Sequence, residues 1–173
     1  NDVFLLKYNP GLGLEWTRQF GSGEGPGEDY TLVDAEDGNI FTAGQTTGAL
    51  LAQTNAGSYD VFLRKSDADG NVLWSRQFGT AADERCTGVL ATTTGVYVLG
   101  QTSGTLAGQT SSGYLDAFLA KYSPDGHLVW TRQFGSSAND YPRGIAADDS
   151  GVYVPGFTSG VMAGQENAGG SDA

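Results

Sequence analysis

The chain has 173 residues, 27 of them glycine, and its 20 acidic and 9 basic side chains give a formal net charge of −11. This charge argues against nucleic acid or an anionic lipid surface as a partner, because both are negative as well. Apolar runs fall far short of the roughly 20 residues that span a bilayer, so membrane insertion is not expected. A single cysteine excludes a disulfide framework within the chain.

The sequence contains one motif written three times. An Asp-x-Phe-Leu tetrad recurs at intervals of 58 and 56 residues, and a tryptophan and an Arg-Gln-Phe-Gly segment follow each tetrad. The recurring residues are Asp2, Asp60 and Asp116; Trp16, Trp74 and Trp130; and Arg18, Arg76 and Arg132. We expect a single repeat array over 1–173, with blades of approximately 2–59, 60–115 and 116–171. Residues 172–173 open a fourth copy, and the two extra residues of the first copy fall in a glycine-rich loop at 21–27.

Each copy predicts four short strands in chain order. In the third copy, a β-type run at 117–122 ends at Ser-Pro-Asp-Gly (123–126), and 128–134 alternates with the period of two of a strand. Asp-Gly between two such runs is a strong hairpin signal. Runs at 144–147 and 152–154 complete the copy, and no stretch has a sustained helical period.

Repeated four-stranded antiparallel units are typical of β-propeller blades. We therefore predict an all-β fold of propeller type with three four-stranded antiparallel blades. A β-solenoid is the alternative, although hairpins would not join its strands. Closed propellers have about four to eight blades, so three leave an incomplete ring unless the chain assembles with other copies or belongs to a longer array.

The third copy resembles the bacterial SBBP β-propeller repeat. The resemblance is carried by 116–135, followed by Asn-Asp-Tyr at 139–141 and Gly-Val-Tyr-Val at 151–154, and it extends to all three copies. It implies a propeller, usually in large secreted or surface-attached bacterial proteins, without shared catalytic residues. The first copy departs from the pattern at 9–13, where Asn-Pro-Gly-Leu-Gly replaces the Asp-Gly turn, and the second has Glu-Arg-Cys at 84–86 where the third has Asp-Tyr-Pro. Both departures are expected to lie in loops.

The recurring aromatic and charged residues have a structural interpretation. We expect the three tryptophans to pack between neighbouring sheets, because each buries roughly 150–250 Å². We expect each arginine to stack on an aromatic ring and to pair with one of the recurring aspartates, because a buried guanidinium needs a partner. An aromatic binding surface and an anion-binding arginine are the functional alternatives.

Calcium is the one cofactor that the sequence leaves open. Asp-Ala-Asp-Gly-Asn at 67–71 resembles the start of a calcium loop, but the downstream acidic ligand is missing, which favours a hairpin turn. The weak calcium candidates are Asp67, Asp69, Asp140, Asp148 and Asp149. His127 is expected to be solvated and Cys86 to be a small buried side chain, so no catalytic residue is predicted.

These observations favour a non-catalytic structural or interaction module of a bacterial surface, extracellular or filament-forming protein. Its partners would be other copies of itself, further blades of a longer chain, another protein or a polysaccharide. The alternatives are a calcium- or carbohydrate-binding lectin-like propeller and, less favoured, an enzyme domain that uses the propeller axis. A cytosolic assembly linker is also compatible with the composition.

Overall fold

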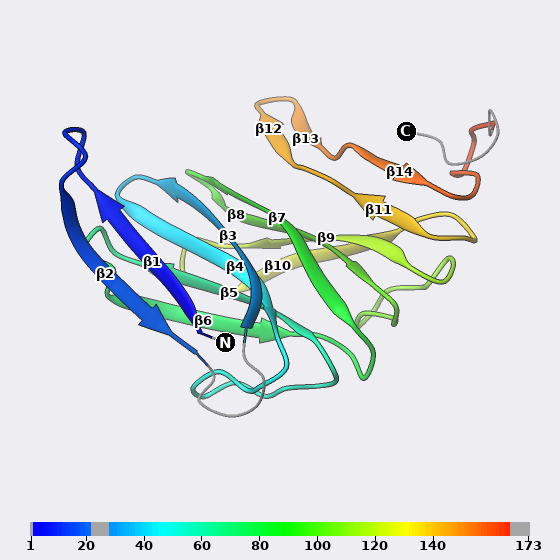
Figure 1. The fold of residues 1–173 in the computed structure, drawn as a ribbon. Coiled ribbons are helices and arrows are strands. Elements are labelled where there is room, and N and C mark those ends of the chain that lie inside the picture. Colours follow the sequence, from blue (N-terminus) through cyan, green and yellow to red (C-terminus); the bar gives the residue numbers. More distant parts are fainter. Residues whose placement is uncertain (1, 22–27, 167–173) are drawn as a thin grey trace.

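The fold is entirely β in the computed structural model, which describes residues 2–21 and 28–166. Over these ranges the chain has strands and no helix, so no helix there could cross a membrane. The strands form several antiparallel sheets, within which hairpins join neighbouring strands, and they do not close into a barrel (Figure 1). The all-β fold of propeller type is confirmed. The proposed start of a fourth copy at 172–173 and most of the loop at 21–27 lie outside the described residues.

Two four-stranded meanders form the centre of the molecule (Figure 1). The first central sheet consists of β3 (Glu28–Glu36), β4 (Asn39–Thr46), β5 (Asp60–Ser66) and β6 (Val72–Phe78). The second central sheet consists of β7 (Glu84–Thr92), β8 (Gly95–Thr102), β9 (Asp116–Tyr122) and β10 (Leu128–Phe134).

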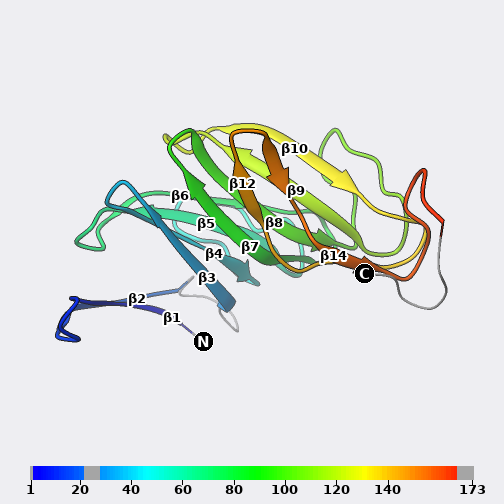
Figure 2. The same ribbon diagram turned by 90° about the horizontal axis from the view of Figure 1, so that it is seen from above.

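A half-sheet lies at each end of this pair (Figures 1 and 2). The N-terminal half-sheet pairs β1 (Val3–Tyr8) with β2 (Leu14–Phe20). The C-terminal half-sheet pairs β11 (Asp140–Pro142) with β14 (Gly156–Thr158) and β12 (Ala146–Asp148) with β13 (Gly151–Tyr153). The strands of three blades are therefore present, with one blade divided between the two ends.

The central sheets are out of phase with the sequence copies. Each takes two strands from one copy and the next two from the following copy, so the Asp-x-Phe-Leu segment begins the third strand of a sheet. The sheet boundaries therefore differ by half a copy from units at 2–59, 60–115 and 116–171. The repeating sequence gives the length of the repeat. The strand at which each sheet begins is known only from the backbone pairing.

Two prolines divide the C-terminal half-sheet into two short ladders. In the second central sheet, the pairing of β7 with β8 continues from Glu84↔Thr102 to Thr92↔Gly95. In the C-terminal half-sheet the pairs between Pro142↔Gly156 and Ala146↔Tyr153 are missing. Proline has no N–H to donate to a ladder, and Pro142 and Pro155 occupy this stretch.

Two segments expected in loops are in fact strand residues. Glu84-Arg85-Cys86 begins β7 and Asp140-Tyr141-Pro142 forms β11. In both places the first residue of the strand also forms a backbone hydrogen bond with the residue that precedes a tetrad: Glu84 N donates to Tyr59 O and Asp140 N to Leu115 O, both at 2.8 Å. Both segments also pair with a strand of their own copy, Glu84 with Thr102 and Asp140 with Thr158, and this pairing makes them strands rather than loops.

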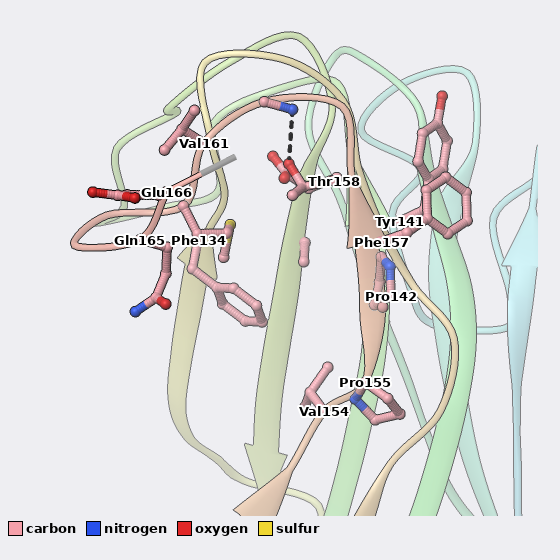
Figure 3. Close-up of a pocket in the computed structure, with 15 residues that line it drawn as sticks. Phe134, Tyr141, Pro142, Val154, Pro155, Phe157, Thr158, Val161, Gln165 and Glu166 are labelled. Atoms are coloured by element: carbon pink, nitrogen blue, oxygen red, sulfur yellow. Dashed lines mark hydrogen bonds between the residues drawn. The ribbon is translucent and has the colours of Figure 1, made fainter. Parts of the chain in front are cut away.

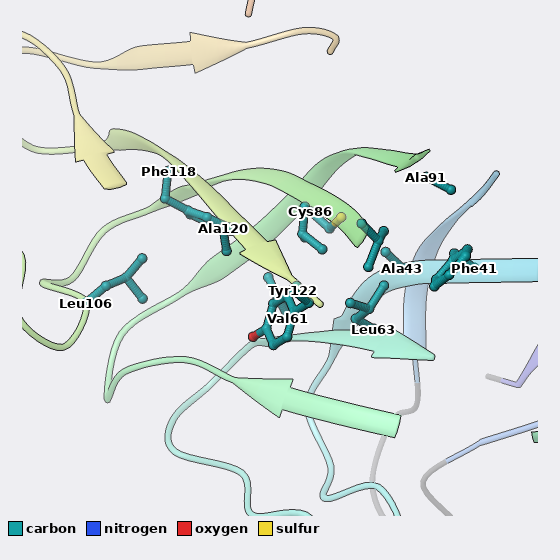
Figure 4. Packing of buried hydrophobic residues seen from close by; sticks show 12 residues of the cluster. Phe41, Ala43, Val61, Leu63, Cys86, Ala91, Leu106, Phe118, Ala120 and Tyr122 are labelled. Carbon is teal, nitrogen blue, oxygen red and sulfur yellow. The ribbon is translucent and has the colours of Figure 1, made fainter. Parts of the chain in front are cut away.

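The main core lies between the two central sheets (Figure 4). Phe41, Val61 and Leu63 of the first sheet meet Phe118 and Tyr122 of the second. Smaller clusters join each central sheet to its neighbouring half-sheet. Neighbouring sheets therefore bury apolar side chains against one another, as propeller blades do.

Candidate functional site

Each Asp-Gly turn of a central sheet is held by the tryptophan of the preceding sheet. The Trp16 indole Nε1 donates to Ala68 O, and the Trp74 Nε1 donates to Pro124 O, both at 3.1 Å. Each indole N–H therefore has a hydrogen-bond acceptor on the neighbouring sheet, and the ring packs against the same turn. Trp130 instead packs beside Tyr97 of its own sheet, with ring centroids 6.0 Å apart.

Glycine is required in these turns for two reasons. Gly70 and Gly126 both have φ of +78°, which side-chain-bearing residues rarely adopt. In addition, a Cβ on Gly126 would lie 2.8 Å from a ring atom of Trp74, and one on Gly70 would lie 3.1 Å from Trp16. In the first copy Leu12 occupies this turn position, with φ of +62°, and is 82% exposed.

The arginines stack as expected, but their predicted carboxylate partners are wrong. The guanidinium carbons of Arg18 and Arg76 lie 5.2 and 5.5 Å from the ring centroids of Trp16 and Trp74. Their hydrogen bonds go to backbone oxygens of the next turn, Arg18 Nη2 to Asp69 O and Arg76 Nε to Gly126 O, both at 2.6 Å. Because turn carbonyls supply the acceptors, no acidic side chain is needed.

The third arginine differs from the other two. Arg132 is exposed and donates to the neighbouring Thr131 O at 3.0 Å. No turn of a following sheet reaches it within the described part of the chain. Trp130 and Arg132 are therefore the counterparts of the two tryptophan–arginine pairs that contact a turn, but no described turn contacts them.

The recurring aspartates bind the glutamine of Arg-Gln-Phe-Gly. The Gln Nε2 to Asp Oδ2 distances are 2.7 Å for Gln19–Asp2, 3.1 Å for Gln77–Asp60 and 2.8 Å for Gln133–Asp116. Asp60 Oδ2 also accepts from Ala56 N at 2.8 Å, and Gln77 Oε1 accepts from Leu50 N at 2.9 Å. This network ties the third and fourth strands of a sheet to the long connection that precedes them.

A second buried carboxylate lies close to two of these aspartates, Asp60 and Asp116. Asp60 Oδ1 and Glu84 Oε2 both lie nearer than 3.0 Å to the point that a Cβ of Gly79 would occupy. Both side chains are fully buried, and Asp60 Oδ1 has no hydrogen-bond partner. Burial, with the nearby Asp60 charge adding to it, raises the pKa of Glu84. Protonation of Glu84 would therefore reduce the repulsion between the two carboxyl groups.

The same arrangement recurs at the next junction with a shorter acid. Asp116 and Asp140 flank Gly135, and both are buried with an unpartnered Oδ1. Asp140 Oδ2 accepts from Ser136 N at 2.7 Å. The recurring paired carboxylates were not found from the sequence, because the second acid is Glu in one copy and Asp in the other.

The five calcium candidates do not come together. Asp67 accepts from the Asn71 side chain within its own turn, which lowers the pKa of Asp67, and Asp69 is exposed in the same turn. Asp140 is buried at a sheet junction, whereas Asp148 and Asp149 are exposed in the β12–β13 turn. Hydrogen bonds from Ser150 lower the pKa of Asp148. The described residues contain no cluster of three metal-binding side chains.

The two residues considered for catalysis have inert surroundings. Cys86 is buried, and desolvation raises the pKa of its thiol to about 12, so little thiolate forms at neutral pH. His127 is exposed at the β9–β10 turn, where its backbone N–H donates to Ser123 Oγ. Neither lies in a constellation of nucleophile, base and orienting group.

A cavity of about 300 Å³ opens between the second central sheet and the C-terminal half-sheet. Its apolar lining includes Phe134, Val154, Pro155, Val161 and Met162. Figure 3 shows the Phe134 ring between the loop of Val161 and the segment of Val154 and Pro155. This cavity could not be predicted from the sequence, because its residues Phe134, Gly156 and Met162 occupy the same repeat positions as Phe78, Gly100 and Leu106, which pack around Phe118.

Comparison with known proteins gives two findings. Residues 129–160 match the family described as SBBP, Beta-propeller repeat, which amounts to a single repeat. The chain is 28% identical over 170 residues to a protein of Caulobacter vibrioides called Regulatory protein FlaEY. This similarity covers 89% of the chain and only 18% of that relative.

Proposed function

We propose that this chain is a non-catalytic interaction module, in which rigid repeated sheets present an open apolar site to a protein partner. The observation that carries the proposal is the cavity of about 300 Å³ between the second central sheet and the C-terminal half-sheet. In both central sheets the equivalent position is filled by side chains of the next copy. An apolar cavity between two rigid sheets is suited to binding another chain.

The comparisons support the scaffold and a regulatory context. We propose that all three copies are repeats of the SBBP type, because the tetrads, tryptophans and turns recur in the sequence and in the strand pairing. Similarity to a protein called regulatory agrees with binding rather than turnover. We further propose a bacterial surface or extracellular setting, which the SBBP resemblance supports.

Site-specific photo-cross-linking would test the proposal. A photoreactive amino acid at Tyr141, whose ring stacks on Phe157 at 4.7 Å on the rim of the cavity, should yield discrete protein adducts in cells that produce the chain. The same amino acid at Leu51, an exposed residue of the connection between β4 and β5, should not. A glycan array run with and without calcium provides the comparison with a lectin.

The outcomes separate the candidate functions. Discrete adducts from residue 141, with no glycan binding, support a protein-binding module. Calcium-dependent glycan binding would favour the lectin-like alternative. Equal labelling from both positions would contradict a specific site at the cavity.

A further inference from the structure

The buried acid pairs at the two sheet junctions lack a positive partner. The first junction, between the two central sheets, holds Asp60 and Glu84, and the second, between the second central sheet and the C-terminal half-sheet, holds Asp116 and Asp140. All four side chains are at most 4% exposed. Within the described residues none of them forms a salt bridge, and the ion pairs found there join other, more exposed side chains. Because buried charges in proteins are normally paired or bind a metal ion, each pair calls for a compensating charge.

At the first junction one carboxylate oxygen has no hydrogen-bond donor. Asp60 Oδ2 accepts from Ala56 N at 2.8 Å and from Gln77 Nε2 at 3.1 Å. Asp60 Oδ1 has no partner, and it lies with Glu84 Oε2 around the point that a Cβ of Gly79 would occupy. A buried anionic oxygen without a donor is unfavourable, because it has lost its water and gained nothing in exchange. This oxygen therefore marks a position suited to a positive ligand.

The second junction repeats the arrangement. Asp116 Oδ2 accepts from Ser112 N and Gln133 Nε2, both at 2.8 Å, and Asp116 Oδ1 has no partner. Asp116 Oδ1 and Asp140 Oδ2 lie around the Cβ point of Gly135, and Asp140 Oδ1 is also unpartnered. The second acid is Glu at one junction and Asp at the other. What recurs is therefore the pair of buried charges rather than a side chain of one length.

Hydroxyl groups add neutral oxygen atoms beside each pair. They belong to Thr80 and Thr102 at the first junction and to Ser136 and Thr158 at the second. Thr102 Oγ1 lies 2.6 Å from Glu84 Oε1, and Ser136 Oγ lies 3.3 Å from Asp140 Oδ2. Each junction thus combines two carboxylates with two hydroxyls, and hard divalent cations prefer oxygen ligands of this kind.

We propose that each junction binds one calcium ion at its two buried carboxylates, Asp60 with Glu84 and Asp116 with Asp140. A divalent ion matches the two negative charges, whereas a monovalent ion would leave one of them uncompensated. Calcium is favoured over magnesium because it accepts irregular sets of oxygen ligands. Magnesium requires octahedral geometry and keeps several waters, which a buried site accommodates poorly. The ion stabilises the junctions between sheets, so the inference does not rest on the proposed function.

Calcium and a proton are alternative ways to reduce the repulsion within a pair. In the calcium-free protein, protonation of Glu84 serves this purpose, in agreement with its raised pKa. Calcium needs the ionised carboxylates, so binding the ion releases that proton. The effect of calcium is therefore best measured at neutral pH or slightly above.

The Asp-Gly turn at 67–71 is the competing calcium site. Asp67 Oδ1 already accepts from Asp69 N and Asn71 N, and its Oδ2 accepts from the Asn71 side chain. The carboxylate of this turn is satisfied by its own loop, whereas those of the junctions have unpartnered oxygens. Asp69→Asn removes a charge from this exposed turn and is the matched control for the junction variants.

Equilibrium dialysis against radioactive calcium tests the sites by their number. At about 1 mM free calcium in about 0.15 M NaCl, where exposed charges are screened, the wild type should retain two ions. Asp60→Asn and Asp116→Asn should each retain one, because the amide removes a charge from one pair without changing the size of the side chain. Asp69→Asn should retain two. Fewer than two ions on the wild type, two on either junction variant, or a loss in Asp69→Asn would overturn the proposal.

Urea unfolding at a pH of about 7.5 gives an independent measurement. Replacing EGTA with about 1 mM calcium should raise the wild-type midpoint by about 1 M, because an ion that binds only the folded state stabilises it. The rise should be about half as large in Asp60→Asn, whose amide oxygen can keep the contacts with Ala56 N and Gln77 Nε2. Magnesium should raise the wild-type midpoint by less than about a quarter as much. No rise with calcium, an undiminished rise in Asp60→Asn, or an equal rise with magnesium would overturn the proposal.

Discussion

The central sheets and the terminal half-sheets have the same sequence pattern but bury it differently. Phe118 is 0% exposed and Phe4 is 68% exposed, although both are the phenylalanine of the same tetrad. The difference is that Phe118 has a full sheet on its pairing edge and a neighbouring phenylalanine against its ring. The motif therefore supplies half of each packing site, and the adjacent copy supplies the other half.

This comparison explains why a repeat array gains stability as copies are joined. Each junction between copies adds a tryptophan hydrogen bond to a turn, a glutamine–aspartate hydrogen-bond network and a buried tetrad phenylalanine. A terminal half-sheet makes only part of these contacts. The stability of such an array is approximately a sum of terms for units and for junctions, so equivalent substitutions should differ by position.

The largest difference is expected for the tetrad phenylalanine. Phe118→Ala should lower the free energy of unfolding by about 3–5 kcal/mol, because it leaves a cavity in the core between the two central sheets. Phe4→Ala should cost less than about 0.5 kcal/mol in dilute protein, where the side chain faces solvent. Urea unfolding followed by tryptophan fluorescence measures both. Similar losses for the two variants would contradict the comparison.

The turn glycines give the next effect. Gly126→Ala combines an unfavourable positive φ with a Cβ 2.8 Å from Trp74, and about 3 kcal/mol should be lost. Gly108→Ala is the matched control, because Gly108 has φ of +71° and a Cβ added there would have no atom within 4 Å, so about 1 kcal/mol is expected. Equal losses in urea unfolding would mean that the indole does not press on the turn.

The sequence was sufficient for features that a single copy contains. The period of two in 128–134, the Asp-Gly turns and the threefold repetition predicted the hairpins and the propeller type. Features made between copies were harder to predict. The arginine partners lie about one copy away in the backbone of a turn, where no residue type marks them.

The point at which each sheet begins and the cavity could not be predicted from the sequence for the same reason, since both depend on contacts between copies. A repeating sequence has the same period whatever point is taken as its start, so residues alone did not show that a sheet begins at β3 or β7. The cavity is recognised only when its lining residues Phe134, Gly156 and Met162 are compared with the equivalent residues that pack around Phe62 and Phe118. The division of β11–β14 was signalled by Pro142 and Pro155, but only once both were placed in paired strands.

The glutamine network gives a smaller contrast. Gln77→Ala should cost about 1–3 kcal/mol, because Leu50 N–H loses its acceptor and Asp60 loses a donor in a partly buried site. Gln19→Ala removes a single exposed hydrogen bond to Asp2 and should cost less than about 0.5 kcal/mol. Thermal unfolding of the two variants at the same pH provides the measurement. A larger loss for Gln19→Ala would contradict the role of the network at interior junctions.

The smallest effect concerns pH at the junction of the two central sheets. The folded state raises the pKa of Glu84 mainly by burial, so it favours the protonated form. The resulting stabilisation is complete below the pKa of Glu84 in the unfolded chain and is lost as pH rises through its folded pKa. Asp60→Asn should weaken this pH dependence, because the amide can donate to Glu84 Oε2 while its oxygen keeps Ala56 N and Gln77 Nε2.

Urea unfolding at several pH values between about 4 and 8 would test this, with Asp69→Asn, in an exposed turn, as the control. The wild type and the control should lose stability together as pH rises through the folded pKa of Glu84, and Asp60→Asn should lose less and be more stable by about 1 kcal/mol at neutral pH. If all three proteins gained stability over this range, Glu84 would have to be ionised in the folded state. The facing carboxylates would then repel each other across Gly79 without a shared proton.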